Sequence, residues 1–115
     1  MAGEHELPAW HSTFSANADV ARSTVHARGD LDVLTVDLLW GTIDVLLRSG
    51  HYEITVDLSG LASIDAAGVK LLVALQHSLR THSGGLTVVG ARPLVAEALE
   101  RGHVFLQPQL LHQTG

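Results

Sequence analysis

The hydrophobic and polar residues of this chain follow two periods, one typical of strands and one typical of helices. Residues 23–28 alternate between apolar and polar, which predicts a half-exposed strand, because successive side chains of a strand point to opposite faces. Residues 54–58 alternate less clearly and are rich in β-branched residues, which fits a central strand. Shorter runs at residues 13–20 and 86–89 predict an edge strand and a fourth strand.

Apolar residues at three- and four-residue spacing predict amphipathic helices over residues 33–48, 66–81 and 94–101. Asp32 and Asp65 are suited to cap the first two helices, and Pro93 suits the start of the third. The residues expected to face the core from the first two helices are Leu34, Leu38, Leu39, Ile43, Leu46, Leu47, Val69, Leu72, Val73, Leu75 and Leu79.

The elements are separated by short polar or glycine-containing segments. Gly29-Asp30 is expected to close the second strand, and Ser59-Gly60 to form a turn after the third. The order β-β-α-β-α-β-α predicts an α/β fold: a mixed, largely parallel sheet of about four or five strands, with about three or four helices. A fifth strand would come from residues 104–106. We expect one domain over residues 13–106, between a flexible N-terminal arm (1–12) and a C-terminal tail (107–115).

Composition narrows the class of protein. A hydrophobic fraction of 46% supports a real core, and the absence of cysteine excludes disulfides, thiolate ligands and a cysteine nucleophile. A net charge of −5 with one lysine argues against a nucleic-acid surface. No apolar run approaches the ~20 residues that span a bilayer, so we expect a cytoplasmic protein without membrane insertion.

Candidate chemistry is sparse. His77 and His82 are five residues apart and do not align on one helix face, so the eight histidines predict no metal site. No phosphate-binding glycine motif occurs, and no serine–histidine–aspartate set follows from the spacing. We therefore predict a binding protein without catalytic residues, metal or cofactor, rather than an enzyme. A small enzyme or nucleotide binder is the alternative from another class.

Three segments of the chain together resemble the sequence pattern of one known domain family. Gly29-Asp30-Leu31-Asp32 is similar to the segment before the family's first helix. Residues 56–61 and 63–69 resemble the strand–loop–helix signature, in which an aspartate precedes two small or hydroxyl residues and a glycine. Residues 85–90, followed by a proline-started helix that ends at Gly102, complete a match over about residues 14–103. With these three segments the chain resembles the STAS family, the domain of anti-sigma-factor antagonists.

The resemblance implies a STAS-like fold and a function. Such a bacterial protein binds an anti-sigma factor of the serine-kinase-like ATPase type and so frees a sigma factor for transcription. A homodimer is also compatible with the sequence. The residues expected to form the partner-binding surface are Asp30, Asp32, Ser59, Ser63, Asp65, Ala66, Ala67, Gly68, Val69 and Lys70.

Several of these residues also have a purely structural explanation. Ser59 and Ser63 suit turn and cap hydrogen bonds, and Asp32 suits a helix cap. Gly68 either admits a partner or lets the second helix pack closely on its neighbours. Lys70 is equally consistent with an ordinary solvated side chain.

The chain departs from the family pattern at Ala66 and Ala67. Many members carry a serine or threonine directly after the signature aspartate, and its phosphorylation ends binding. Alanine accepts no phosphate, so we expect binding without a phosphorylation switch at this loop. Similar domains with a non-phosphorylatable loop resemble accessory subunits of membrane lipid-transport complexes, which is the second candidate function.

Overall fold

The computed structural model describes residues 14–104; the predicted arm and tail lie outside this range, as do residues 105 and 106 of the predicted fifth strand. Val104, which the prediction placed in that strand, is buried but belongs to no strand. The predicted order of strands and helices is confirmed, with a short 3-10 helix (η2, Val20–Arg22) added after the first strand. The main elements are β1 (Ser15–Asp19), β2 (Thr24–Leu31), α1 (Val36–Arg48), β3 (Glu53–Ile64), α2 (Ala66–Thr81), β4 (Gly85–Val89) and α3 (Pro93–Arg101).

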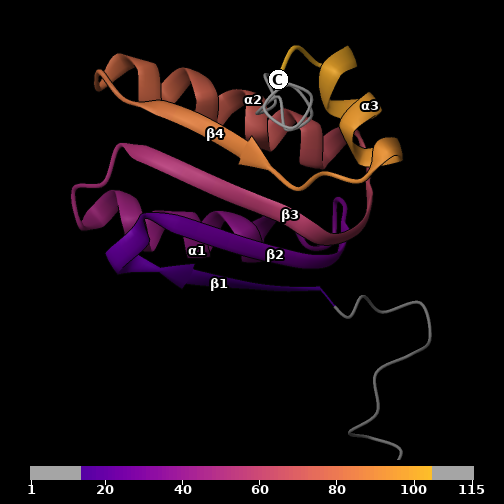
Figure 1. Cartoon of the computed structure of the whole chain (residues 1–115), viewed down its shortest axis with the longest axis horizontal. Helices are drawn as coiled ribbons and strands as arrows, with labels where there is room; N and C mark the ends of the chain where they lie inside the picture. Colours follow the sequence, from indigo (N-terminus) through magenta and orange to yellow (C-terminus); the bar gives the residue numbers. More distant parts are fainter. Residues whose placement is uncertain (1–13, 105–115) are drawn as a thin grey trace, which may run out of the picture.

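The sheet has the strand order β1-β2-β3-β4, with β1 antiparallel to β2 and the other pairs parallel. The described residues thus form a four-stranded mixed, largely parallel sheet with three α-helices, as the fold class predicts. Figure 1 shows α1 along β1 and β2, and α2 and α3 on the side of β3 and β4. None of the helices within residues 14–104 has the combination of length and apolar character that crossing a membrane takes.

The core is aliphatic and lies between the helices and one face of the sheet. Leu39, Ile43 and Leu46 of α1 are fully buried, as predicted. Leu34 and Leu38, also predicted to face the core, are 65% and 57% exposed. Leu38 precedes Leu39 by one residue and is therefore rotated about 100° around the helix axis, away from the buried stripe. Leu34 lies in the turn before the helix.

β2 and β3 are longer than the sequence predicts. Residues 29–30 and 59–60, interpreted as a strand end and a turn, both lie inside strands. The two strands pair in parallel there, with register shifts that accommodate the glycine-containing segments. A side chain on Gly60 would place its Cβ 2.8 Å from the Cβ of Arg28, so glycine permits this close pairing. β3 consequently runs to Ile64, well past its last pairing with β4 at Asp57.

The first helix begins three residues later than predicted. Asp32 does not cap it: α1 starts at Val36, after Thr35. The Thr35 hydroxyl, in a residue that is almost fully buried, donates to the carbonyl of Asp30 (2.8 Å) and accepts from the amide of Asp32 (2.9 Å). The Asp32 carboxylate instead accepts from the amide of Leu34 (2.9 Å). Asp32 therefore stabilises a turn between β2 and α1, and this turn delays the helix.

The sheet face opposite the helices carries polar residues, which include a histidine–aspartate pair. His26 Nδ1 lies 3.1 Å from Asp57 Oδ2, across the β2–β3 pairing. The amide of Ser59 donates to Asp57 Oδ1 (2.9 Å). Partial burial alone would raise the pKa of Asp57, but hydrogen bonds from the Ser59 amide and side chain, together with His26, outweigh it and lower the pKa.

Asp57→Asn should weaken the dependence of stability on pH in acid. Because the pKa of Asp57 is lower in the folded state, its stabilising contribution is present above about pH 4 and disappears as pH falls through the folded value. The difference should be below about 1 kcal/mol, since the pair is partly exposed. Urea denaturation between neutral and acid pH measures it, and parallel pH profiles for the two proteins would contradict it.

Candidate partner-binding site

Asp65 joins three separate parts of the chain at the carboxyl edge of the sheet. Its backbone is extended, and its Oδ1 accepts from the amide of Gly68 (3.1 Å), which makes it the N-cap of α2 as predicted. Its Oδ2 accepts from the amide of Val33 (3.2 Å), in the turn before α1. Its own amide donates to the carbonyl of Leu31 (3.0 Å), at the end of β2. One residue therefore holds β2, the α1 turn and α2 together.

Asp30 and Ser63 complete an acidic surface beside this junction. They pair in register at the ends of β2 and β3, and the Ser63 hydroxyl donates to Asp30 Oδ1 at 2.6 Å. The carboxylates of Asp30, Asp32 and Asp65 therefore lie on adjoining segments of the chain. The surface is therefore negative, and it favours a partner that presents basic side chains.

The first turn of α2 presents small side chains. Ala66 is exposed, Ala67 is half-buried, and Lys70 is exposed one turn further on. Gly68 is buried: a Cβ there would lie 2.7 Å from Ile64 Cγ1 and 2.8 Å from Leu31 Cγ. Of its two explanations, close packing is the one that the contacts support. Gly68 lets the first turn of α2 pack against Ile64 and Leu31, and Ala66 and Lys70 are the exposed residues of this turn.

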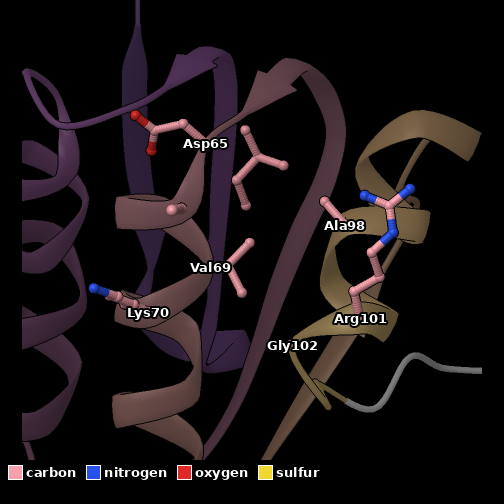
Figure 2. Close-up of a pocket in the computed structure, with 8 residues that line it drawn as sticks. Asp65, Val69, Lys70, Ala98, Arg101 and Gly102 are labelled. Atoms are coloured by element: carbon pink, nitrogen blue, oxygen red, sulfur yellow. The ribbon is translucent and has the colours of Figure 1, made fainter.

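A groove of about 470 Å³ runs between the first turns of α2 and the end of α3 (Figure 2). It is lined by Ile64, Asp65, Ala66, Val69, Lys70, Ala98, Arg101 and Gly102. Val69, a predicted site residue, points into the space between the helices, whereas the amino group of Lys70 points to the other side of α2. Sequence reasoning missed the contribution of α3. Gly102, whose missing side chain lets Val69 approach, is the signal that could have indicated it.

Ser59 is the predicted site residue that the structure places apart from the others. It precedes Asp65 by six residues on an extended strand, a separation of about 15–20 Å. Its amide bonds to Asp57, and its carbonyl accepts from Arg92 Nε (3.3 Å). These contacts tie the open sheet face to the segment before α3. They give Ser59 a structural role through local hydrogen bonds, which is the alternative to partner binding that the sequence left open for it.

The histidines have separate local contacts. His26 pairs with Asp57, and His51 Nδ1 lies 2.9 Å from the Ser23 hydroxyl. His82 stacks on Tyr52, with ring centroids 4.5 Å apart. Among residues 14–104, no three histidine or carboxylate side chains gather in a group able to hold a metal ion.

Fold and site together define a class: a small α/β domain whose distinctive surface is an ordered helix-start loop between a long parallel strand and α2. The family model described as "Mlab, STAS domain" matches residues 14–104. The chain belongs to the STAS family. Among curated proteins, none is similar enough in sequence to match.

Two solved structures have the same fold. One is a crystal structure at 1.59 Å of a Thermotoga maritima protein assigned as an anti-sigma factor antagonist; its TM-score is 0.65 at 17% identity, over 88% of this chain and 92% of that chain. The other is the anti-sigma factor antagonist SpoIIAA in its unphosphorylated form. Its TM-score is 0.63 at 19% identity, over 89% of this chain and 97% of that chain. At these identities the likeness establishes the fold.

Asp65→Ala should destabilise the protein by about 1–2 kcal/mol, because it removes the α2 cap and the bond to Val33. Asp65→Asn should cost less, since its single side-chain oxygen can still accept one of the two amides. Urea denaturation at neutral pH measures both changes. An Ala variant as stable as the parent would show that Asp65 does not hold the junction together.

Gly68→Ala should destabilise the protein by about 1–3 kcal/mol, because the added methyl group overlaps Ile64 and Leu31. Gly41→Ala is the matched control: Gly41 is also inside a helix, but a Cβ there meets nothing within 4 Å. That change should raise the free energy of unfolding by up to about 1 kcal/mol. Equal effects at the two glycines, measured by thermal or urea denaturation, would rule out the packing role of Gly68.

Proposed function

We propose that this chain acts as an anti-sigma-factor antagonist-like protein in the cytoplasm. It binds an anti-sigma factor of the serine-kinase-like ATPase type and so frees a sigma factor for transcription. The observation that carries the proposal is the Asp65 junction, which orders an exposed loop at a site where a partner can reach it. Membership in the STAS family and the fold shared with anti-sigma factor antagonists support it.

The geometry suits binding without rearrangement. Hydrogen bonds from Gly68, Val33 and Ser63 hold the loop before any partner arrives. A surface that is already ordered loses less conformational entropy on association, so more of the contact energy appears as affinity. Basic partner residues would meet the carboxylates, and an apolar partner side chain would enter the groove beside Val69.

The loop provides no phosphorylation switch at the family's position. A phosphate after Asp65 would add bulk and about −1.5 to −2 charges beside the Asp65 carboxylate, and this bulk and repulsion would disfavour a partner docked closely over the loop. Ala66 and Ala67 have the size and neutrality of the unmodified state. We therefore expect the binding surface to be permanently available at this loop. Labelling near Asp65, for instance at Ser63, by the cognate kinase and ATP would contradict this.

The second candidate, an accessory subunit of a membrane lipid-transport complex, is favoured by one specific observation. The family model that matches this chain, which has alanine at both positions after Asp65, is the one described as Mlab. Purification of the tagged full chain from its native cell distinguishes the two candidates. A soluble kinase-like ATPase supports the antagonist function, whereas an ATPase–permease complex supports the transport function.

Ala66→Glu should weaken binding of the captured partner by at least tenfold (about 1.4 kcal/mol or more), because its larger side chain at the exposed start of α2 would keep a partner from docking closely on this turn. A carboxylate in the first turn is favourable for the helix dipole, so the fold should be retained. Ala66→Ser, which stays small and neutral, is the matched control and should bind like the parent. Calorimetry with the purified partner measures the affinities. Unchanged binding by the Glu variant would show that the interface lies elsewhere on the domain.

A further inference from the structure

The groove between α2 and α3 is a largely apolar hollow that the described residues do not fill. Val69 of α2 and Ala98 of α3 line its two sides, and Ile64 lines it at the end of β3 (Figure 2). Its volume of about 470 Å³ is enough for several side chains of one peptide segment. An occupant of this groove would gain free energy mainly by burying apolar surface.

The charged groups around the groove are engaged or turned away. Arg101 Nη2 donates to the carboxylate of Glu97 (2.9 Å). The carboxylate of Asp65 accepts the amides of its two partners in the junction. The amino group of Lys70 points to the other side of α2. None of these groups calls for an opposite charge in the groove, so the groove suits an uncharged apolar occupant.

The described part of the chain ends beside this groove. Gly102 lines it, and Nε2 of Gln76 on α2 donates to the carbonyl of His103 (3.2 Å). The side chain of Val104 is buried. Gln76 follows Val69 by seven residues on the same face of α2, a separation of about 10 Å along the helix axis. Residue 105 therefore begins about 10 Å along α2 from the groove.

The composition of residues 105–115 matches the character of the groove. Four of these eleven residues are large and apolar, and none is aspartate, glutamate, lysine or arginine. The four are Phe105, Leu106, Leu110 and Leu111. Segments that remain in solvent are typically poor in such residues and rich in charge. This composition indicates a segment that covers an apolar surface.

The segment is also long enough to reach the groove. Residues 105–109 can span about 16 Å, more than the distance of about 10 Å to the level of Val69. Pro108 presets one dihedral angle of a turn, so the chain can reverse there and bring Leu110 and Leu111 back toward the start of α2. A tether this short gives an effective concentration on the order of millimolar, at which even a weak contact is populated.

We propose that residues 105–115 dock in the groove of their own chain, with Leu110 and Leu111 against Val69 and Ala98. Exposed apolar side chains also occur on α1, Leu38 among them. However, α1 lies along β1 and β2, whereas the chain leaves α3 on the side of β3 and β4, next to the groove (Figure 1). The contact is made within one chain, so it does not depend on protein concentration.

Docking of this segment would regulate the partner-binding site. Asp65 and Ala66 line the groove, so a docked segment would cover one side of that site and compete with the partner. This control acts in the groove and needs no phosphate at the loop. It rests on the proposed function, whereas the docking itself is tested without the partner.

A spin label on the segment tests the docking. The chain has no cysteine, so Gln113→Cys provides a single attachment point for a nitroxide. In the amide spectrum of the full chain, the label should broaden the signals of Val69 and Ala98 and leave those of α1 sharp. Adding Leu110→Gln and Leu111→Gln should remove this selective broadening. These two changes lie outside the described domain, so unfolding does not explain the loss.

Matched variants separate docking from simple proximity to the end of α3. Gln107→Asn with Gln109→Asn changes the same segment at polar positions and should keep the broadening. Ala98→Gln, which fills the groove, should remove it, and Leu38→Gln on α1 should not. Equal broadening with and without the two leucines would overturn the docking. So would broadening of an isotope-labelled chain by a separate spin-labelled chain, since the segment would then occupy a second copy.

The affinity for the captured partner tests the competition. If the segment is docked for about 50–90% of the time, Leu110→Gln with Leu111→Gln should strengthen binding by about two- to tenfold. Calorimetry measures the change, with Gln107→Asn and Gln109→Asn as the control that binds like the parent. Weaker binding by the leucine variant would place the segment in the partner's interface and overturn the competition. Failure of the proposed function would leave the spectra, which need no partner, unchanged.

Discussion

The parallel pairing of β2 with β3 is the constraint on which the rest of the structure depends. Parallel strands end at the same edge of a sheet, so the carboxyl end of β2 and that of β3 meet, with Asp30 paired to Ser63 and Leu31 to Ile64. The segments that follow, the turn before α1 and the start of α2, must therefore leave from neighbouring points. Asp65 can bridge them because the pairing has already brought them within hydrogen-bond distance. The sheet topology therefore brings the segments of the site together, and the Asp65 carboxylate joins them by hydrogen bonds.

The sequence predicts most accurately what local periodicity determines. The bounds of α2, its cap at Asp65 and the proline-started α3 followed by Gly102 all come from spacing and end signals within a few residues. The ends of β2 and β3 could not be predicted in this way. Their glycine-containing segments are local turn signals, but pairing along the two strands satisfies the backbone hydrogen bonds that a turn would leave open. The later start of α1 has the same cause, because the buried Thr35 bonds to the end of β2.

The candidate site divides in the same way between local and long-range interactions. The sequence alone predicts the cap at Asp65 and the small residues in the first turn of α2. The bond of Asp65 to Val33 and that of Ser63 to Asp30 join residues more than thirty positions apart, so only the sheet topology brings them together. The groove requires α3 to lie against α2, and its residues have no distinguishing sequence pattern except Gly102. Ser59, which the prediction included in the partner-binding surface, is separated from the other site residues by the extension of β3.

The glycines differ in whether the domain itself requires the missing side chain. Gly60 allows β2 and β3 to approach, and Gly68 allows α2 to pack on Leu31 and Ile64; in both places a side chain would collide with the domain itself. Gly41 lowers helix stability without relieving any such collision. No packing contact within the described residues calls for a glycine at this position. The neighbouring exposed leucine and valine side chains make the same point, because their burial would gain free energy only when another surface covers them.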